Sequence, residues 1–405
     1  MQDVLNIRNY FPGLSQKVHG KPLVYFDNAA TTHRLQSVID AYSDLIISSN
    51  GNVHRSPHYL GQMATKSFEN TRDKVQEFIH AKHRHEIIFT RGTTEAINLV
   101  AFSYGETFIN EGDEIIVSEM EHHSNIVPWQ MMCERKGAIL KVIPFDDEGN
   151  LLLDEYDSLL TERTKLVAVT AISNVLGTIN PIEKIIEKAH RKGAHVLIDG
   201  AQAIVHKKIN IQEINCDFFA FSAHKMYGPT GVGVLYGKED LLEQMQPYQG
   251  GGEMISEVTF KETTYGNLPT KFEAGTPDFT SVASFSKAID FINSIDLSAC
   301  ISHENKLLRY AEEKLKNIEG IMFYGTSANK ASLLSFTIEG MHPFDTATLI
   351  DKLGFAIRTG RMCADPIMDH YGVQSMMRIS FAPYNTFEEI DQFYVALLRI
   401  REMFS

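Results

Sequence analysis

An acidic and a basic side chain each follow a short apolar run near the middle of the chain. The run 196–198 leads into Asp199, and a second run, 218–221, is followed within four residues by Lys225. Continuous apolar runs of this length are typical of strands that are buried on both faces of a parallel sheet. Because open α/β sheets bind ligands at the carboxyl ends of their strands, we expect both side chains in one site.

This pair offers the two protein groups that pyridoxal phosphate chemistry requires. A lysine amine in a tight pocket has a lowered pKa and is suited to Schiff-base formation, and an aspartate can face the pyridine nitrogen. A lone lysine just past a strand is more often an ordinary surface residue. Asp199 on a neighbouring strand end changes that balance, and the turn 226–229, with its glycine and proline, indicates a tight pocket around Lys225.

Another strand-to-helix junction has the features of a phosphate site. The predicted strand 86–91 ends at Gly92-Thr93-Thr94, where a helix is expected to begin. Free backbone N–H groups, threonine hydroxyls and the positive end of the helix dipole favour a phosphate there. Threonine caps are common, so the motif alone is weak evidence. Its place at the same kind of strand end as Asp199 and Lys225 strengthens the prediction.

Cysteine usage separates one residue from three others. Cys363 follows a predicted strand and a glycine turn, with Arg358 and Arg361 within five positions, and neighbouring cations favour the nucleophilic thiolate. No C-x-x-C spacing occurs, so neither a disulfide framework nor a zinc site is predicted. The remaining cysteines are expected to be inert small hydrophobic residues: Cys133, Cys216 and Cys300.

Two histidines four residues apart, His54 and His58, have the spacing of metal ligands on a helix. Pro57 disfavours a helix between them, and no carboxylate stands at a matching spacing. We therefore expect a cleft-lining segment here and no metal site.

Composition limits the class of protein. The 405 residues are enough for two domains, and 43% apolar and 22% charged residues are ordinary for globular proteins. A formal net charge of −13 argues against binding to nucleic acid or to an anionic membrane. No run reaches the roughly 18 to 20 apolar residues of a membrane span. The amino-terminal segment lacks the pattern of a signal peptide. The scattered cysteines fit a reducing cytoplasm as the expected location.

The segments 199–202 and 222–225, together with the arginine- and cysteine-containing segment 358–364, resemble the class V aminotransferase superfamily. Within it they are most similar to the cysteine desulfurase and selenocysteine lyase family of the short-loop Suf type. The similarity runs over nearly the whole chain.

The resemblance implies an α/β fold, that of pyridoxal phosphate-dependent transferases of fold type I. We expect a large domain, residues 21–290, with a mostly parallel seven-stranded sheet flanked by helices. A smaller α+β domain, residues 1–20 and 291–405, would carry the cysteine loop. The alternation of apolar strands with helical stretches such as 182–192 independently predicts a parallel sheet.

The resemblance also implies a role for each residue around the cofactor. Lys225 holds the cofactor and moves the proton from the substrate Cα to C4′, while Asp199 keeps the pyridine nitrogen protonated. His122 stacks on the ring and relays protons, and Gln202 contacts the phenolic oxygen. The phosphate contacts are expected from Thr93, Thr94, Ser222 and His224, and from Thr276, which in a homodimer reaches the site of the partner subunit.

The resemblance places the substrate, L-cysteine, against Asn174, Arg358 and Arg378, because a guanidinium pairs well with a planar carboxylate. A buried structural ion pair is the alternative for Arg378. The Cys363 thiolate then attacks the substrate sulfur, which leaves a persulfide on the enzyme and L-alanine as product. An acceptor protein of the SufE or SufU type would collect the sulfur for iron–sulfur cluster assembly.

The cysteine segment departs from the family pattern just before Cys363, and two other functions stay open. Met362 stands where a histidine usually precedes the cysteine, and we hypothesise that Arg361 replaces its electrostatic contribution. A selenocysteine lyase or cysteine-sulfinate desulfinase would use Lys225 and Asp199 but depend less on Cys363. The non-catalytic alternative is a cofactor-bearing assembly scaffold that the Met362 substitution has inactivated.

Overall fold

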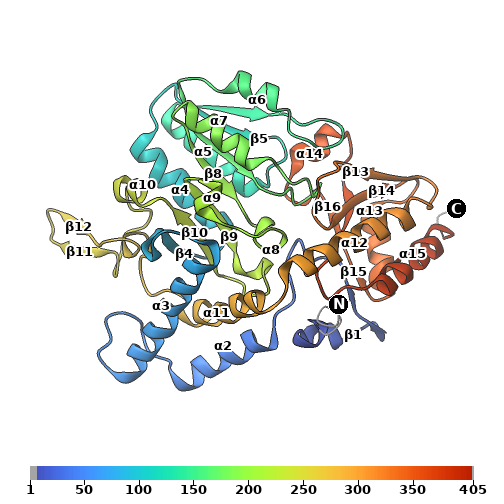
Figure 1. The fold of residues 1–405 in the computed structure, drawn as a ribbon, viewed down its shortest axis with the longest axis horizontal. Coiled ribbons are helices and arrows are strands. Elements are labelled where there is room, and N and C mark those ends of the chain that lie inside the picture. Colours follow the sequence, from blue (N-terminus) through green and yellow to red (C-terminus); the bar gives the residue numbers. More distant parts are fainter. Residues whose placement is uncertain (1–6, 404–405) are drawn as a thin grey trace.

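The computed structural model describes residues 7–403 and has an α/β fold built around one large sheet (Figure 1). Its seven strands follow the order β4-β10-β9-β8-β7-β5-β6. Neighbours from β9 to β6 are parallel, whereas β10 is antiparallel to both β4 and β9, so the predicted mostly parallel sheet is confirmed. The strands are β4 (Ile87–Thr90), β5 (Glu114–Ser118), β6 (Ile139–Ile143), β7 (Thr164–Thr170), β8 (His195–Asp199), β9 (Phe218–Ser222) and β10 (Gly233–Gly237).

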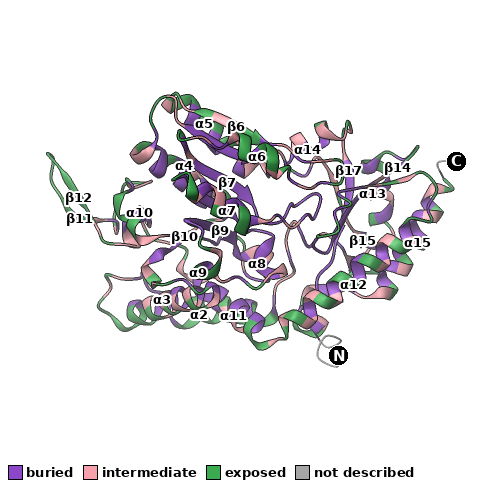
Figure 2. Ribbon diagram, turned by 45° about the horizontal axis from the view of Figure 1, so that its top comes forward, coloured by how far each residue is buried: buried purple, intermediate pink, exposed green. Residues whose placement is uncertain are grey.

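Helices cover both faces of this sheet, so its central strands are buried on two sides (Figure 2). In β8, Val196 and Ile198 pack into one hydrophobic core, and Leu197 packs into another. Burial on two faces explains why these strands are continuous apolar runs rather than alternating ones. The first core includes residues of α3 (Tyr59–Ile79), α7 (Ile182–Arg191) and α11 (Phe279–Ser294), and the second includes residues of α4 (Thr93–Phe108) and α5 (Val127–Lys136).

The carboxyl-terminal part contains a second sheet, antiparallel, with strand order β13-β14-β17-β16. It has a hydrophobic core of its own, to which the helices α12, α13 and α15 contribute. This is the α+β arrangement that we expect for the smaller domain. The elements are α12 (Leu297–Leu315), β13 (Ile321–Tyr324), β14 (Leu333–Ile338), α13 (Pro343–Asp351), β16 (Arg358–Gly360), α14 (Asp365–His370), β17 (Met376–Ser380) and α15 (Phe387–Arg401).

The amino-terminal strand β3 (Val24–Tyr25) is tied to this carboxyl-terminal part. It pairs in parallel with β15 (Phe355–Ala356), and an isolated bridge joins Asp27 to Ser380. Residues that are far apart in the sequence therefore meet beside the central sheet.

We keep the division into residues 21–290 and residues 1–20 with 291–405 as a proposal. The separate sheets and cores support two units, while β3 lies within the predicted large unit and pairs with the other one. Residues 1–6 of the proposed small domain lie outside the described residues.

A hairpin of β11 (Ile255–Val258) and β12 (Thr263–Tyr265) projects from the body of the protein (Figure 1). Within residues 7–403, no helix has the length and apolar content that crossing a membrane requires. The other elements are β1 (Lys17–Val18), β2 (Lys21–Pro22), α2 (Gln36–Ser48), α6 (Leu153–Leu159), α8 (Ala203–His206), α9 (Ile211–Ile214) and α10 (Glu239–Gln244), with short 3₁₀ turns between them.

Candidate active site

A cavity lies at the carboxyl edge of the central sheet. Its walls include Thr170, Asp199 and Ser222, the last residues of three adjoining parallel strands, and residues of the second sheet close it from the other side. The predicted site residues that line this cavity are Thr93, Thr94, His122, Asn174, Asp199, Gln202, Ser222, His224, Lys225, Arg358, Cys363 and Arg378.

Asp199 and Lys225 stand at the floor of the cavity. Asp199 ends β8, is almost fully buried, and accepts a hydrogen bond from the Ala201 N–H at 2.9 Å. Burial raises the pKa of Asp199, and the nearby Lys225 opposes that rise. Burial lowers the pKa of Lys225 to about 8, with a further lowering from Arg378 and an opposing effect of Asp199 and Cys363. A lysine in this environment has a larger share of neutral, reactive amine near physiological pH than an ordinary surface lysine.

Hydroxyl groups gather where α4 begins. The Ser222 hydroxyl accepts a hydrogen bond from the Thr93 N–H at 2.8 Å and shares another with the Thr93 hydroxyl at 2.7 Å. Thr94, on the next residue of the helix, also lines the cavity, and His224 Nδ1 lies 3.2 Å from the Thr31 hydroxyl. Hydroxyls at the positive end of a 16-residue helix form a suitable place for an anion such as a phosphate.

His122 presents a neutral imidazole to the cavity. Its Nδ1 accepts a hydrogen bond from the Ser124 N–H at 3.1 Å and lies 2.7 Å from the Ser124 hydroxyl. Burial, helped by the positive charge of Lys225, lowers the pKa of His122 to about 4. Because Nδ1 is an acceptor, the proton of the neutral ring is on Nε2, where it can be donated.

Glu121 is a buried acid beside the cavity that sequence reasoning did not identify. Its carboxyl group accepts hydrogen bonds from the Asn125 side chain at 2.7 Å, from the Thr170 N–H at 2.9 Å and from the Ser118 hydroxyl. Burial raises the pKa of Glu121 to about 8. These bonds fix the segment that carries His122 to the end of β7. An acid directly before a candidate histidine was the available signal.

Arg378 is a buried cation whose two terminal nitrogens have partners. Its Nη1 donates to the Asn174 carbonyl at 2.6 Å, and its Nη2 lies 3.2 Å from Asp27 Oδ1. Its Nε has no hydrogen-bond partner among the described residues. Arg358, opposite Arg378 in the β16–β17 register, is half exposed and lies 3.9 Å from the other oxygen of Asp27. The structural ion pair and a carboxylate-binding role for Arg378 are therefore compatible.

The Cys363 thiol lies on an exposed turn that closes the cavity. Met362 and Cys363 both have φ of 54°, in the left-handed region that residues other than glycine rarely adopt. The Met362 side chain is buried in the first hydrophobic core. Its carbonyl accepts a hydrogen bond from Asn174 Nδ2 at 2.9 Å. Met362 thus has a packing role at the position where a histidine is usual.

Arg361 does not direct its charge at the thiol. Its guanidinium binds the carboxylates of Asp365 and Asp369, and these hydrogen bonds raise the pKa of Arg361. Two carboxylates balance its charge. The structure therefore gives no support to the hypothesis that Arg361 replaces the missing histidine electrostatically.

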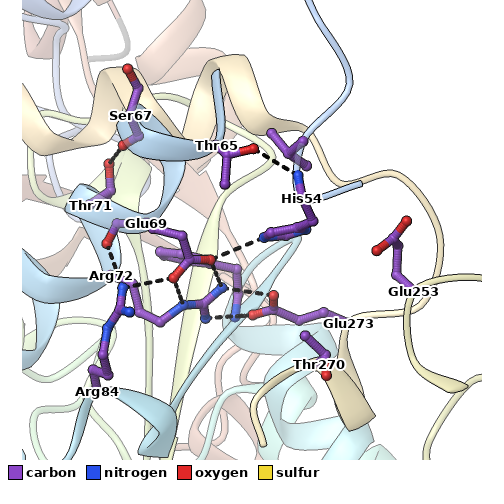
Figure 3. Close-up of polar contacts among 12 residues, drawn as sticks. His54, Thr65, Ser67, Glu69, Thr71, Arg72, Arg84, Glu253, Thr270 and Glu273 are labelled. Atoms are coloured by element: carbon purple, nitrogen blue, oxygen red, sulfur yellow. Dashed lines mark hydrogen bonds and ion pairs between the residues drawn. The ribbon is translucent and has the colours of Figure 1, made fainter. Parts of the chain in front are cut away.

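Thr276 is the predicted site residue that lies outside the cavity, and it is exposed. Its segment begins at Glu273, whose carboxylate forms two hydrogen bonds with the buried Arg72, at 2.8 and 2.9 Å (Figure 3). Glu69 binds the same guanidinium at 3.1 Å, and its pKa is lowered to about 2, where hydrogen bonds from His54 and Arg72 outweigh burial. A buried ionic cluster thus anchors the Thr276 segment to α3.

The histidines with metal-like spacing have other partners. His58 caps α3 by accepting a hydrogen bond from the Gly61 N–H, and His54 Nε2 lies 3.1 Å from Glu69 Oε1 (Figure 3). Across residues 7–403, no group of three or more His, Cys, Asp or Glu side chains has the arrangement of a metal site.

Comparison with known proteins identifies the family. The chain matches the family model for class-V aminotransferases over residues 24–393. A probable cysteine desulfurase of Halalkalibacterium halodurans is 48% identical, covering 98% of this chain and 98% of its own length. A probable cysteine desulfurase of Mycolicibacterium paratuberculosis is also 48% identical over 99% of this chain, which spans only 58% of that longer relative.

A solved structure agrees with these sequence matches. The crystal structure of an Escherichia coli cysteine desulfurase in its S-sulfonic acid form has a TM-score of 0.92, at 38% identity over 99% of each chain. The chain belongs to the class-V aminotransferase family, whose members depend on pyridoxal phosphate. Within that family it belongs with the cysteine desulfurases, and its fold is that of fold type I.

Proposed function

We propose that this protein is a cysteine desulfurase, which converts L-cysteine to L-alanine and takes up the sulfur as a persulfide on Cys363. One observation carries the proposal: Lys225 and Cys363, contributed by different parts of the chain, line the same cavity. The names of the relatives support it. Because the chain spans only 58% of its Mycolicibacterium relative, we do not extend the activity of that whole protein to it.

The chemistry of the cavity fits pyridoxal phosphate. It supplies an amine with a lowered pKa, a buried carboxylate, a neutral imidazole and a hydroxyl-rich helix start. When bound, the cofactor supplies an electron sink for a carbanion at the substrate Cα. Lys225 would hold the aldehyde carbon, Asp199 the ring nitrogen, Gln202 the phenolic oxygen and His122 the ring face, and the phosphate would be held by Thr93, Thr94, Ser222 and His224.

The arginines would bind and orient the amino acid. Arg378 lines the cavity and is buried, and a buried guanidinium attracts a carboxylate strongly. Arg358 and Asn174 stand beside it. With the α-carboxylate fixed there, Lys225 as the free amine removes the proton from Cα, and the neutral His122 can donate one from Nε2.

The sulfur step uses the exposed thiol. The Cys363 thiolate attacks the substrate sulfur, so that a sulfur–sulfur bond forms while the substrate Cβ–S bond breaks. The electron pair of the broken bond stays with the substrate carbon, which is protonated to give alanine. Cys363 then carries the extra sulfur on the surface of the protein, where an acceptor can reach it.

The proposal also covers the cellular location, the oligomeric state and the sulfur acceptor. By resemblance, the protein is a cytoplasmic homodimer in which Thr276 completes the phosphate site of the partner subunit. The exposure of Thr276 and the ionic anchor at Glu273 support that role. A SufE- or SufU-type acceptor would carry the sulfur to iron–sulfur cluster assembly.

An alanine-formation assay tests the proposal. The protein loaded with pyridoxal phosphate should release alanine from L-cysteine, and Cys363→Ala should lower that rate by about 10²-fold or more, since it removes the nucleophile. L-Selenocysteine turnover should persist in Cys363→Ala, because selenium leaves more readily. Equal loss of both activities would contradict a sulfur-specific role of Cys363. No alanine from L-cysteine, with good turnover of selenocysteine or cysteine sulfinate, would identify the alternative enzyme.

A further inference from the structure

The loop that carries Cys363 is hydrogen-bonded to the large sheet side of the cavity through two successive carbonyl groups. Asn174 Nδ2 donates to the Met362 carbonyl at 2.9 Å, and the His123 N–H donates to the Cys363 carbonyl at 2.7 Å. Met362 and Cys363 are the residues of this loop, other than glycine, that have left-handed φ. Residues other than glycine keep this backbone conformation only where their surroundings hold them in it. The two hydrogen bonds are therefore placed where the loop needs support.

The side chain of His123 holds the same loop at a second point. Its Nε2 lies 2.7 Å from the Asp365 carboxylate and 3.1 Å from the Asp365 N–H. The ring donates to the carboxylate in one tautomer and accepts from the backbone in the other, so either form fixes it on Asp365. His123 thus contacts the loop at two points, the carbonyl of the thiol-bearing residue 363 and residue 365.

The position of His123 in the chain gives this contact a functional meaning. It directly follows His122, which lines the cavity, and the adjoining Glu121 anchors the segment to β7. The segment that orients the imidazole therefore also orients the thiol. His123 itself is not among the residues that line the cavity, and its ring contacts Asp365 instead.

We propose that His123 is a positioning residue that holds the Cys363 thiol at the mouth of the cavity, an inference that rests on the proposed function. Loss of the His123 side chain lowers the turnover of L-cysteine, which needs the thiol. It spares the turnover of L-selenocysteine, which depends less on the thiol. Substrate binding is unaffected, because Arg378, Arg358 and Asn174 are retained.

The test compares His123→Ala and His123→Gln in the enzyme loaded with pyridoxal phosphate. His123→Ala should lower kcat for L-cysteine by about 10²-fold, the effect expected for a misplaced nucleophile, with KM unchanged. L-Selenocysteine turnover should stay near the wild-type value. His123→Gln retains an amide that can bind Asp365 and should recover most of the L-cysteine activity. In a double-mutant cycle on an Arg361→Ala background, which removes the other partner of Asp365, Asp365→Ala should add little to His123→Ala, because both remove the contact between these two side chains.

The matched control is His190→Ala, which removes another 2.7 Å histidine–aspartate contact, to Asp217, away from the cavity. It should leave the ratio of L-cysteine to L-selenocysteine turnover unchanged. An equal fall of both activities in His123→Ala would reduce its role to structural support, and no fall in either would overturn the proposal.

Hydrogen exchange gives a readout that does not depend on the proposed activity. In His123→Ala, amides of residues 361–366 should exchange faster, while those of β8 and β9 should not change. Unchanged exchange in the loop would contradict the proposal. The loop amides could exchange faster in His123→Ala while the wild-type protein makes no alanine from L-cysteine. That result would contradict the proposed function but would still support the role of His123 in holding the loop.

Discussion

The two reactive side chains, Lys225 and Cys363, are held by opposite kinds of structure. Lys225 follows a central strand that is buried on both faces, and the carbonyl of its neighbour His224 accepts a hydrogen bond from the Thr32 N–H at 3.0 Å. Cys363 lies on an exposed turn in an unfavourable backbone conformation, held by contacts from His123 and from Asn174 to the preceding residue. One group is fixed by the fold itself and the other by a few local contacts.

This difference matches the tasks of the two groups. An amine that moves a proton at one carbon needs a fixed position, which a packed sheet provides. A thiol that collects sulfur and then passes it on has to be reachable from outside, so it cannot be buried in the same way. Substitutions that affect only one of the two regions should therefore have different consequences.

The largest effect is expected from Lys225→Ala. Loss of the amine should lower turnover of both L-cysteine and L-selenocysteine by at least about 10³-fold, because proton transfer at Cα is common to both. The two rates are measured in the protein reconstituted with pyridoxal phosphate. Lys330→Met is the control, since burial also lowers the pKa of Lys330 to about 8 but that lysine lies outside the cavity. A comparable loss in Lys330→Met would mean that folding, and not the Lys225 amine, is responsible.

The rate of cofactor uptake should depend on pH through Lys225. Its pKa is lowered to about 8, so the amine is mostly protonated below that pH and mostly free above it. Only the free amine is nucleophilic. The uptake rate of the apoprotein, followed by absorbance, should rise about tenfold per pH unit below pH 8 and level off above it. A rise that continues to about pH 10, as for an unperturbed lysine, would show that burial does not control this amine.

Two glycine substitutions, one near Lys225 and one near Cys363, should have different effects on the two activities. A Cβ at Gly228, in the turn after Lys225, would lie 2.7 Å from the Phe285 ring, so Gly228→Ala should destabilise the protein by about 1–3 kcal/mol. It should lower both activities. Gly360 has φ of 112° with open space around it, so Gly360→Ala strains only the loop, by about 1–3 kcal/mol.

The two activities of Gly360→Ala test whether Cys363 is supported independently of Lys225. Turnover of L-cysteine should fall more than that of L-selenocysteine, since the strain lies between Arg358 and Cys363. Denaturant unfolding gives the stability changes, and the two assays give the ratio. The same ratio in both glycine variants would count against separate support of the two groups.

The smallest effect is expected from Arg361→Ala. Asp365 and Asp369 already balance the charge of this exposed guanidinium, so L-cysteine turnover should change by less than about twofold. The rate of Cys363 alkylation should change as little. A large fall in both rates would revive the hypothesis that Arg361 activates the thiol.

The sequence was sufficient to predict the groups that follow apolar strands. Asp199, Ser222 and Lys225 could be placed at one sheet edge because two-sided burial leaves a clear pattern, and the resemblance supplied His122 and Arg378. Residues whose roles depend on contacts between distant segments could not be found in this way. Asp27 and His123 have no local pattern, and Glu121 has only its place directly before His122. The orientation of Arg361 depends on carboxylates in the following helix.

The central claim is that Lys225 and Cys363 act on one substrate molecule in one cavity. Its most direct test is a single turnover, in which protein loaded with pyridoxal phosphate receives less than one equivalent of L-cysteine. We predict that alanine and a Cys363 peptide carrying one extra sulfur atom form in equal amounts, and that Lys225→Ala forms neither. Alanine without sulfur on Cys363, or sulfur on a different cysteine, would contradict the account.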